Sequence, residues 1–67
     1  MPNDQWISTL ADGRKVKFTR DELTDTTFLT AQIQGNEVVY SILLNKTGVK
    51  LCRQEVEGRF KRELSKQ

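Results

Sequence analysis

Sixty-seven residues are enough for one small domain, and 36% hydrophobic with 30% charged residues is typical of a folded domain rather than a disordered chain. With no histidine and a single cysteine, an intrachain disulfide is excluded and a zinc site is not expected. The formal net charge of +2 is too small to indicate nucleic-acid binding by itself.

A chain this short buries only about 60% of the surface that its unfolded form exposes, so its core alone gives marginal stability. Because neither a disulfide nor a metal supports it, we expect a homodimer. No apolar run approaches the roughly 20 residues of a membrane span, and residues 1–10 lack the layout of a signal peptide. Together with the lone thiol of Cys52, these features predict a cytoplasmic protein without a membrane partner.

The first predicted element is a β-hairpin over residues 7–19. Asp12-Gly13 is expected to form its two-residue turn, because both central positions of a type I′ turn need positive φ. Folding about this turn pairs Ile7 with Phe18 on one face. The opposite face then carries Trp6, Ser8, Leu10, Lys15 and Lys17. The tryptophan has two interpretations: it forms a ligand platform with the lysines, or it covers the edge of a small core.

The next segment matches a capping box. In Thr19-Arg20-Asp21-Glu22 the threonine can cap the backbone and the glutamate can reach back to it. The pattern predicts a single helical turn, or a polar loop, that runs to about Asp25.

A second hairpin is predicted over residues 27–44, around a Gly35-Asn36 turn that also suits positive φ. Its apolar face pairs Ile33 with Val38, Ala31 with Tyr40 and Leu29 with Ile42. Its other face carries Phe28, Thr30, Gln32, Val39, Ser41 and Leu43. Because both faces are partly apolar, we expect this hairpin in the middle of a sheet or inside a dimer.

The last third of the chain changes period. Val49-Lys50-Leu51 alternates like a short fifth strand, and an amphipathic helix is predicted over about 53–65. The apolar stripe of the helix consists of Cys52, Val56, Phe60 and Leu64. Opposite charges one turn apart pair Arg53 with Glu57, Glu55 with Arg59 and Glu57 with Lys61. The helical pattern does not explain a glycine at Gly58 unless another group packs closely against it.

Residues 1–67 are therefore predicted to form a single mainly β (α+β) domain of two hairpins, a short fifth strand and one C-terminal helix. The chain offers little for catalysis, because it has no histidine and its carboxylates are scattered over turns and the exposed helix face. Cys52 is interpreted as a core thiol on the apolar stripe rather than a reactive one. No glycine-rich phosphate loop is present. We expect no enzyme activity, no metal and no small-molecule cofactor.

The charge distribution is uneven. Residues 46–67 carry seven Lys or Arg against three Glu, whereas the first 45 residues carry four basic and six acidic side chains. A basic end can attract phosphates. The alternative is a solvated helix face whose charges pair within the helix.

Three segments resemble one family. The run from Val49 to Phe60 is similar to the end of the carbon storage regulator (Csr/Rsm) family, in which a valine-rich strand leads through an arginine and acidic residues into a C-terminal helix. Residues 33–38 resemble the family's central hairpin with its Gly-Asn turn, and Ile7-Ser8-Thr9 with Gly13 resembles its first strand and the following turn. The order of five strands and a helix also agrees, over nearly the whole chain.

The resemblance implies an intertwined homodimer that binds GGA-containing loops of single-stranded RNA and regulates translation. The family's first strand carries two arginines that contact RNA, but Leu10 and Ala11 stand at these positions here, which puts the RNA specificity in doubt. Unstacked bases are held by backbone groups and by flat or cationic side chains. The candidate RNA-binding residues are Arg53, Lys50, Val49, Leu51, Lys15, Lys17 and Trp6. Arg53 has a second interpretation, as the first-turn half of an ion pair with Glu57.

Three functions fit the sequence. The first is a dimeric RNA-binding post-transcriptional regulator. The second is a protein-interaction module, such as a phage-type inhibitor or a small accessory subunit, because partly apolar second faces commonly mark partner surfaces. The third is an SH3-like barrel that binds duplex DNA nonspecifically, against which the net acidic first 45 residues argue.

Overall fold

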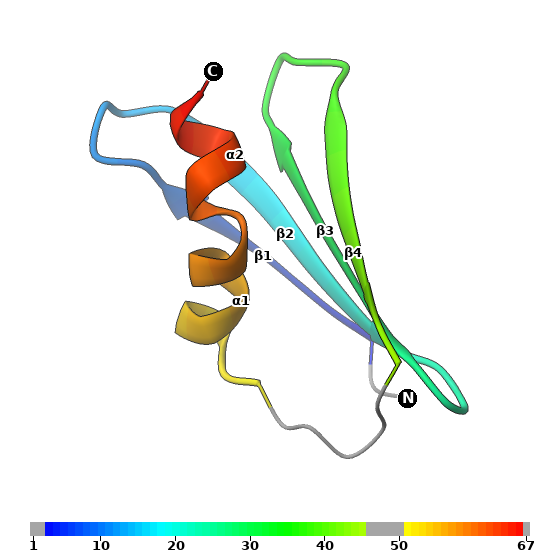
Figure 1. Cartoon of the computed structure of the whole chain (residues 1–67). Coiled ribbons are helices and arrows are strands. Elements are labelled where there is room, and N and C mark those ends of the chain that lie inside the picture. The colour runs from blue at the N-terminus through cyan, green and yellow to red at the C-terminus, as the bar shows by residue number, and fades with distance from the viewer. Residues whose placement is uncertain (1–2, 46–50, 67) are drawn as a thin grey trace.

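The protein is mainly β, with a four-stranded antiparallel sheet and a short C-terminal helical region on one side of it (Figure 1). The computed structural model describes residues 3–45 and 51–66. The elements are β1 (Asn3–Thr9), β2 (Lys15–Glu22), β3 (Thr27–Ile33), β4 (Val39–Leu44), α1 (Arg53–Arg59) and α2 (Lys61–Ser65). The strands follow one another in the order β1-β2-β3-β4, so within these residues β1 and β4 are the edge strands of the sheet.

The register of the first hairpin differs from the predicted one by a single residue. The backbone N–H of Leu10 donates to Arg14 O at 2.7 Å, which leaves a three-residue loop that ends at Gly13 with a φ of 94°. Such loops place glycine in the left-handed region at their third position. Trp6 therefore faces Phe18 across the strands. Because a slip of one residue exchanges the two faces of a strand, Ile7 is exposed and the predicted pairing of Ile7 with Phe18 is wrong.

The helical turn that the capping box predicts does not form. Thr19 to Glu22 belong to β2, and the chain reverses afterwards over residues 23–26, where the backbone N–H of Leu23 donates to Thr26 O at 2.8 Å. The Thr19 hydroxyl bonds to the Thr30 hydroxyl on β3 instead of capping a helix. Pairing with two neighbouring strands outweighs a local cap, because it satisfies more backbone groups.

The second hairpin has the predicted register. Leu29 faces Ile42 and Ala31 faces Tyr40. The predicted pairing of Ile33 with Val38 on the apolar face is wrong, because β4 begins only at Val39 and Val38 is exposed. The connection over residues 34–38 is longer than a two-residue turn. Gly35 alone has a positive φ there, of 87°. The Asn36 side chain accepts a hydrogen bond from the backbone N–H of Val38 at 2.9 Å, a turn typical of asparagine.

The predicted helix is present but broken into α1 and α2 at Phe60. This residue has a φ of −102° and a ψ of 0°, and it lies between the end of α1 and the start of α2. Val56, Phe60 and Leu64 are buried against the sheet, as predicted. Cys52 is exposed, so the prediction that it is a core thiol is wrong. The reason is that Cys52 precedes the helix with an extended backbone (φ −75°, ψ 166°), which turns its side chain off the stripe.

The predicted fifth strand is not part of the described sheet. Val49 and Lys50 lie outside the described residues, and Leu51 is buried but belongs to no strand. The core lies between the sheet and the helical region. Its buried residues are Trp6, Val16, Phe18, Leu29, Ala31, Ile33, Leu51, Val56, Phe60 and Leu64.

Candidate functional site

Trp6, a candidate RNA-binding residue, is a core residue at the edge between the sheet and α1. Its side chain is 9% exposed and stacks on Phe18, with ring centroids 5.7 Å apart. Its indole N–H donates to Glu57 Oε2 at 2.9 Å, and the Ser8 hydroxyl donates to the same oxygen at 3.0 Å. The interpretation of Trp6 as the cover of a small core is confirmed.

Arg53 connects the start of α1 to β1. Its guanidinium lies 5.1 Å from the centre of the Trp6 ring and donates to both carboxylate oxygens of Asp4, at 3.2 and 3.3 Å. Arg20 reaches the same carboxylate at 3.3 Å and also donates to Leu51 O. Arg53 therefore pairs with Asp4 rather than with Glu57, its predicted partner. The carboxylate of Glu57 accepts the hydrogen bonds from Trp6 and Ser8 instead.

The other candidate RNA-binding residues lie apart from this pair. Lys15 and Lys17 are exposed and alternate along β2 with the buried Val16 and Phe18, so they lie on the face away from the helices. Leu51 is buried, and Val49 and Lys50 lie outside the described residues. The structure thus brings Arg53 and Trp6 together and places the two lysines on the opposite face of the sheet.

Two carboxylates have ordinary local partners. The backbone N–H of Cys52 donates to Glu55 Oε1 at 3.2 Å and holds the pKa of Glu55 below its usual value, as expected for an acid that caps a helix start. The backbone N–H of Arg14 likewise lowers the pKa of Asp12 in the first turn. Neither arrangement resembles a catalytic pair. Within residues 3–45 and 51–66, no cluster of three or more potential ligands is placed to hold a metal ion.

A cavity of about 560 Å³ lies between the β1–β2 loop and the helical region. Its lining includes the apolar residues Leu10, Phe18 and Leu64 and the charged residue Lys61. Gly58 also lines it, and a Cβ at this position would meet no atom within 4 Å. No close packing therefore explains this glycine.

Comparison of the chain with protein-family models, curated proteins and solved structures finds no match. The RNA-binding role that the family resemblance implies therefore stays a prediction. Among the helices in the described part of the chain, none is long and apolar enough to cross a membrane.

The largest group of exposed apolar side chains in the sheet lies on and beside β4. Val39 and Leu43 are 51% and 56% exposed on the face away from the helices, and Val38, just before the strand, is 48% exposed. Phe28 on β3 faces Leu43 and is half-buried. Monomeric proteins usually cover such groups or use them as contact surfaces.

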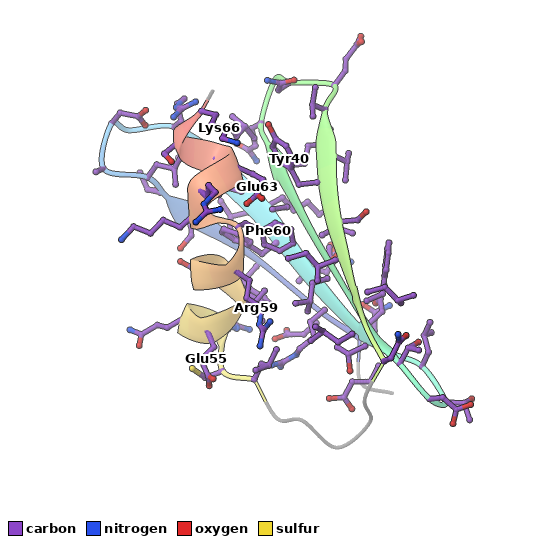
Figure 2. The ribbon with its side chains drawn as sticks, in the orientation of Figure 1. Tyr40, Glu55, Arg59, Phe60, Glu63 and Lys66 are labelled. Carbon is purple, nitrogen blue, oxygen red and sulfur yellow. The ribbon has the colours of Figure 1, made fainter. Side chains whose placement is uncertain are left out.

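The helix-facing side of β4 is also incompletely covered. Tyr40, Ile42 and Leu44 pack against the core but remain partly exposed, whereas Val16 and Leu29 on the central strands are fully buried. The helical region crosses the sheet on the side of β1 and β2 (Figure 1). Figure 2 shows Tyr40 on the side of the sheet that faces α2. The core is therefore thinnest along β4.

Strand β4 also lacks the features that usually keep an edge strand from pairing with another chain. Within the described residues, β3 is its only neighbour in the sheet, so its outer backbone groups point away from the sheet. Its sequence, Val-Tyr-Ser-Ile-Leu-Leu, contains no charged residue, proline or glycine. Natural proteins commonly use charges, prolines or bulges to prevent edge strands from pairing with other chains. The pairing of β3 with β4 runs without a bulge from Thr27–Leu44 to Gln32–Val39. An apolar edge that lacks all three is a candidate site for strand addition.

The two apolar faces of the second hairpin can be predicted from the sequence, but the position of β4 at the edge of the sheet cannot. The hairpin was predicted to lie in the middle of a sheet or inside a dimer, and the first alternative is wrong for β4. The signal that could have found the edge strand was the absence of charge over residues 38–44.

Proposed function

We propose that the chain is a small, non-catalytic protein-interaction module of the cytosol that binds its partner through β4, by adding a strand to the open edge of the sheet. Strand addition supplies main-chain hydrogen bonds, and alternate side chains then contact the partner on both faces. The homodimer that the short length predicts belongs to the same proposal.

The observation that carries the proposal is the uncharged edge of β4 with exposed Val39 and Leu43 on one face and a partly covered apolar row on the other. An RNA surface would instead combine cations with flat side chains. Here Arg53 is held by Asp4, and Trp6 is buried. The exposed lysines of β2 are separated from both by the sheet.

The proposal can be tested by placing a charge on each edge of the sheet. Ser41 and Gln5 lie on the same face, in one row of paired residues that crosses the sheet from β4 to β1. Both are exposed, so Ser41→Lys and Gln5→Lys make the same change at opposite edges. We expect Ser41→Lys to abolish binding to a partner and Gln5→Lys to leave it intact.

The readout is capture of partner protein from nuclease-treated host lysate, together with the mass of the purified chain in solution. The circular dichroism of both variants checks that they are folded. If Ser41→Lys changes neither capture nor mass, β4 is not the interaction surface. Retention of RNA that salt releases, with no dependence on β4, would favour the RNA-binding role.

A further inference from the structure

Resting on the proposed function, we infer that the partner of β4 is a second copy of this chain, paired antiparallel about a two-fold axis at Ser41. The two sheets then join into one of eight strands, in the order β1-β2-β3-β4 and, in the partner, β4-β3-β2-β1. The axis is perpendicular to the sheet, so both helical regions lie on the same side. This arrangement differs from an intertwined dimer, because each copy keeps its own sheet.

The lack of charge on β4 favours a second copy of the chain as its partner. Two copies of one strand carry identical side chains, and like charges directly opposite each other destabilise a strand pair. β4 has no charged side chain, so nothing on it repels a second copy. The other edge strand, β1, does carry a charged side chain. This is Asp4, whose carboxylate forms ion pairs with Arg53 and Arg20 of the same copy.

The order of side chains along β4 also favours this pairing. An axis at Ser41 places Val39 opposite Leu43 of the second copy on the outer face, and Ser41 opposite its own equivalent. On the helix-facing side it places Tyr40 opposite Ile42. Apolar side chains therefore meet apolar ones on both faces, and the hydroxyl groups of the two Ser41 residues meet each other.

Neighbouring registers that keep the helices on one side match less well. Side chains opposite each other lie on the same face, so the axis can move only to Tyr40 or Ile42. With the axis at Tyr40, Leu43 faces Glu37 and Val39 faces Ser41. With the axis at Ile42, Leu43 faces Ser41 and Val39 faces Asn45. The sequence of β4 thus favours one register.

The pairing would also cover the exposed part of the core. Tyr40, Ile42 and Leu44 are the partly exposed residues of the helix-facing side. In the pair, the rows of both copies become neighbours and form one apolar band between the two helical regions. A domain of 67 residues is near the lower size limit for a self-sufficient core, and the second copy supplies the apolar surface that a single copy lacks.

Cysteine cross-linking tests the register in the full chain, with Cys52→Ser as the background because Cys52 is exposed. Residues directly opposite in an antiparallel pair have Cα atoms about 4.5–5.5 Å apart, within disulfide range. Under mild oxidation, Ser41→Cys should cross-link to itself. Val39→Cys should cross-link to Leu43→Cys when the two are mixed but not to itself, since four residues along a strand span about 13 Å.

The mass in solution is the second measurement. We expect the native chain and Gln5→Lys to be dimeric and Ser41→Lys to raise the dimer dissociation constant roughly tenfold or more, because two lysines then face each other across the axis. A monomeric native chain overturns the inference, as does efficient self-cross-linking of Val39→Cys. If the native chain is monomeric but still captures another protein through β4, the inference fails while the proposed function stands. If Ser41→Lys alters neither mass nor capture, both fail.

Discussion

Removal of the Glu57 carboxylate should loosen the attachment of the helical region to the sheet. Two donors, the Trp6 indole N–H and the Ser8 hydroxyl, converge on Oε2 of Glu57 from a strand 49 to 51 residues away in the chain. In Glu57→Ala the indole N–H, which belongs to a side chain only 9% exposed, loses its acceptor.

The magnitude follows from the two bonds. A hydrogen bond to a charged group contributes about 1.5–3 kcal/mol, and an unsatisfied buried donor costs about 1–3 kcal/mol. The second bond is made by a half-buried hydroxyl that water can reach, and alanine adds a few tenths of a kcal/mol of helix propensity. We therefore expect Glu57→Ala to lower the free energy of unfolding by about 2–3 kcal/mol. For a domain of this size that is a fall in Tm of about 8–24 °C.

Urea unfolding at fixed protein concentration, followed by the fluorescence of Trp6, measures this loss, because the chain has a single tryptophan. Glu57→Gln keeps an acceptor oxygen but not the charge, so it should cost about half as much. Gln54→Ala, an exposed change on the same helix, is the control and should cost less than about 0.5 kcal/mol. Equal stability of Glu57→Ala and Gln54→Ala would refute the reasoning.

Three further predictions concern single sites. Gly58→Ala should raise the free energy of unfolding by about 1 kcal/mol in thermal or urea unfolding, because the added methyl group meets nothing within 4 Å; a destabilised variant would contradict the open space assigned to this position. Glu55 has a lowered pKa, so its contribution to stability is present above the pKa of the unfolded chain and is lost as the pH falls through its folded value. Glu55→Gln should therefore make the fall in Tm below about pH 4.5 less steep. The same dependence of Tm on pH in both proteins would count against a stabilising hydrogen bond from the Cys52 backbone N–H to Glu55. Cys52 should react completely with a thiol reagent in the folded protein, at a rate close to that of a free thiol. A thiol that reacts only after denaturant is added would show that Cys52 is buried.

The amount that could be predicted from the sequence differs between the two hairpins. In the second, alternating apolar residues on both strands determine the register, so Leu29 faces Ile42 even though the turn is longer than expected. In the first, the register was derived from the turn alone. Gly13 is the third residue of a longer loop, so Trp6 rather than Ile7 faces Phe18.

The helix stripe was predictable for Val56, Phe60 and Leu64 because a step of four residues keeps side chains on one face. The break at Phe60 and the outward turn of Cys52 depend on backbone angles that periodicity does not report. The interaction surface was predictable only in part. Its apolar residues are visible in the sequence, but their place at an edge depends on which strands pair.

The order β1-β2-β3-β4 also bears on how the chain folds. Each strand pairs with its neighbour in sequence, so the sheet needs only short loops to close, and such local topologies fold quickly. The contact of β1 with α1, by contrast, closes a loop of about 50 residues. During synthesis the meander can therefore assemble first, with Trp6 and Phe18 unshielded from water until α1 and α2 have left the ribosome and folded over them.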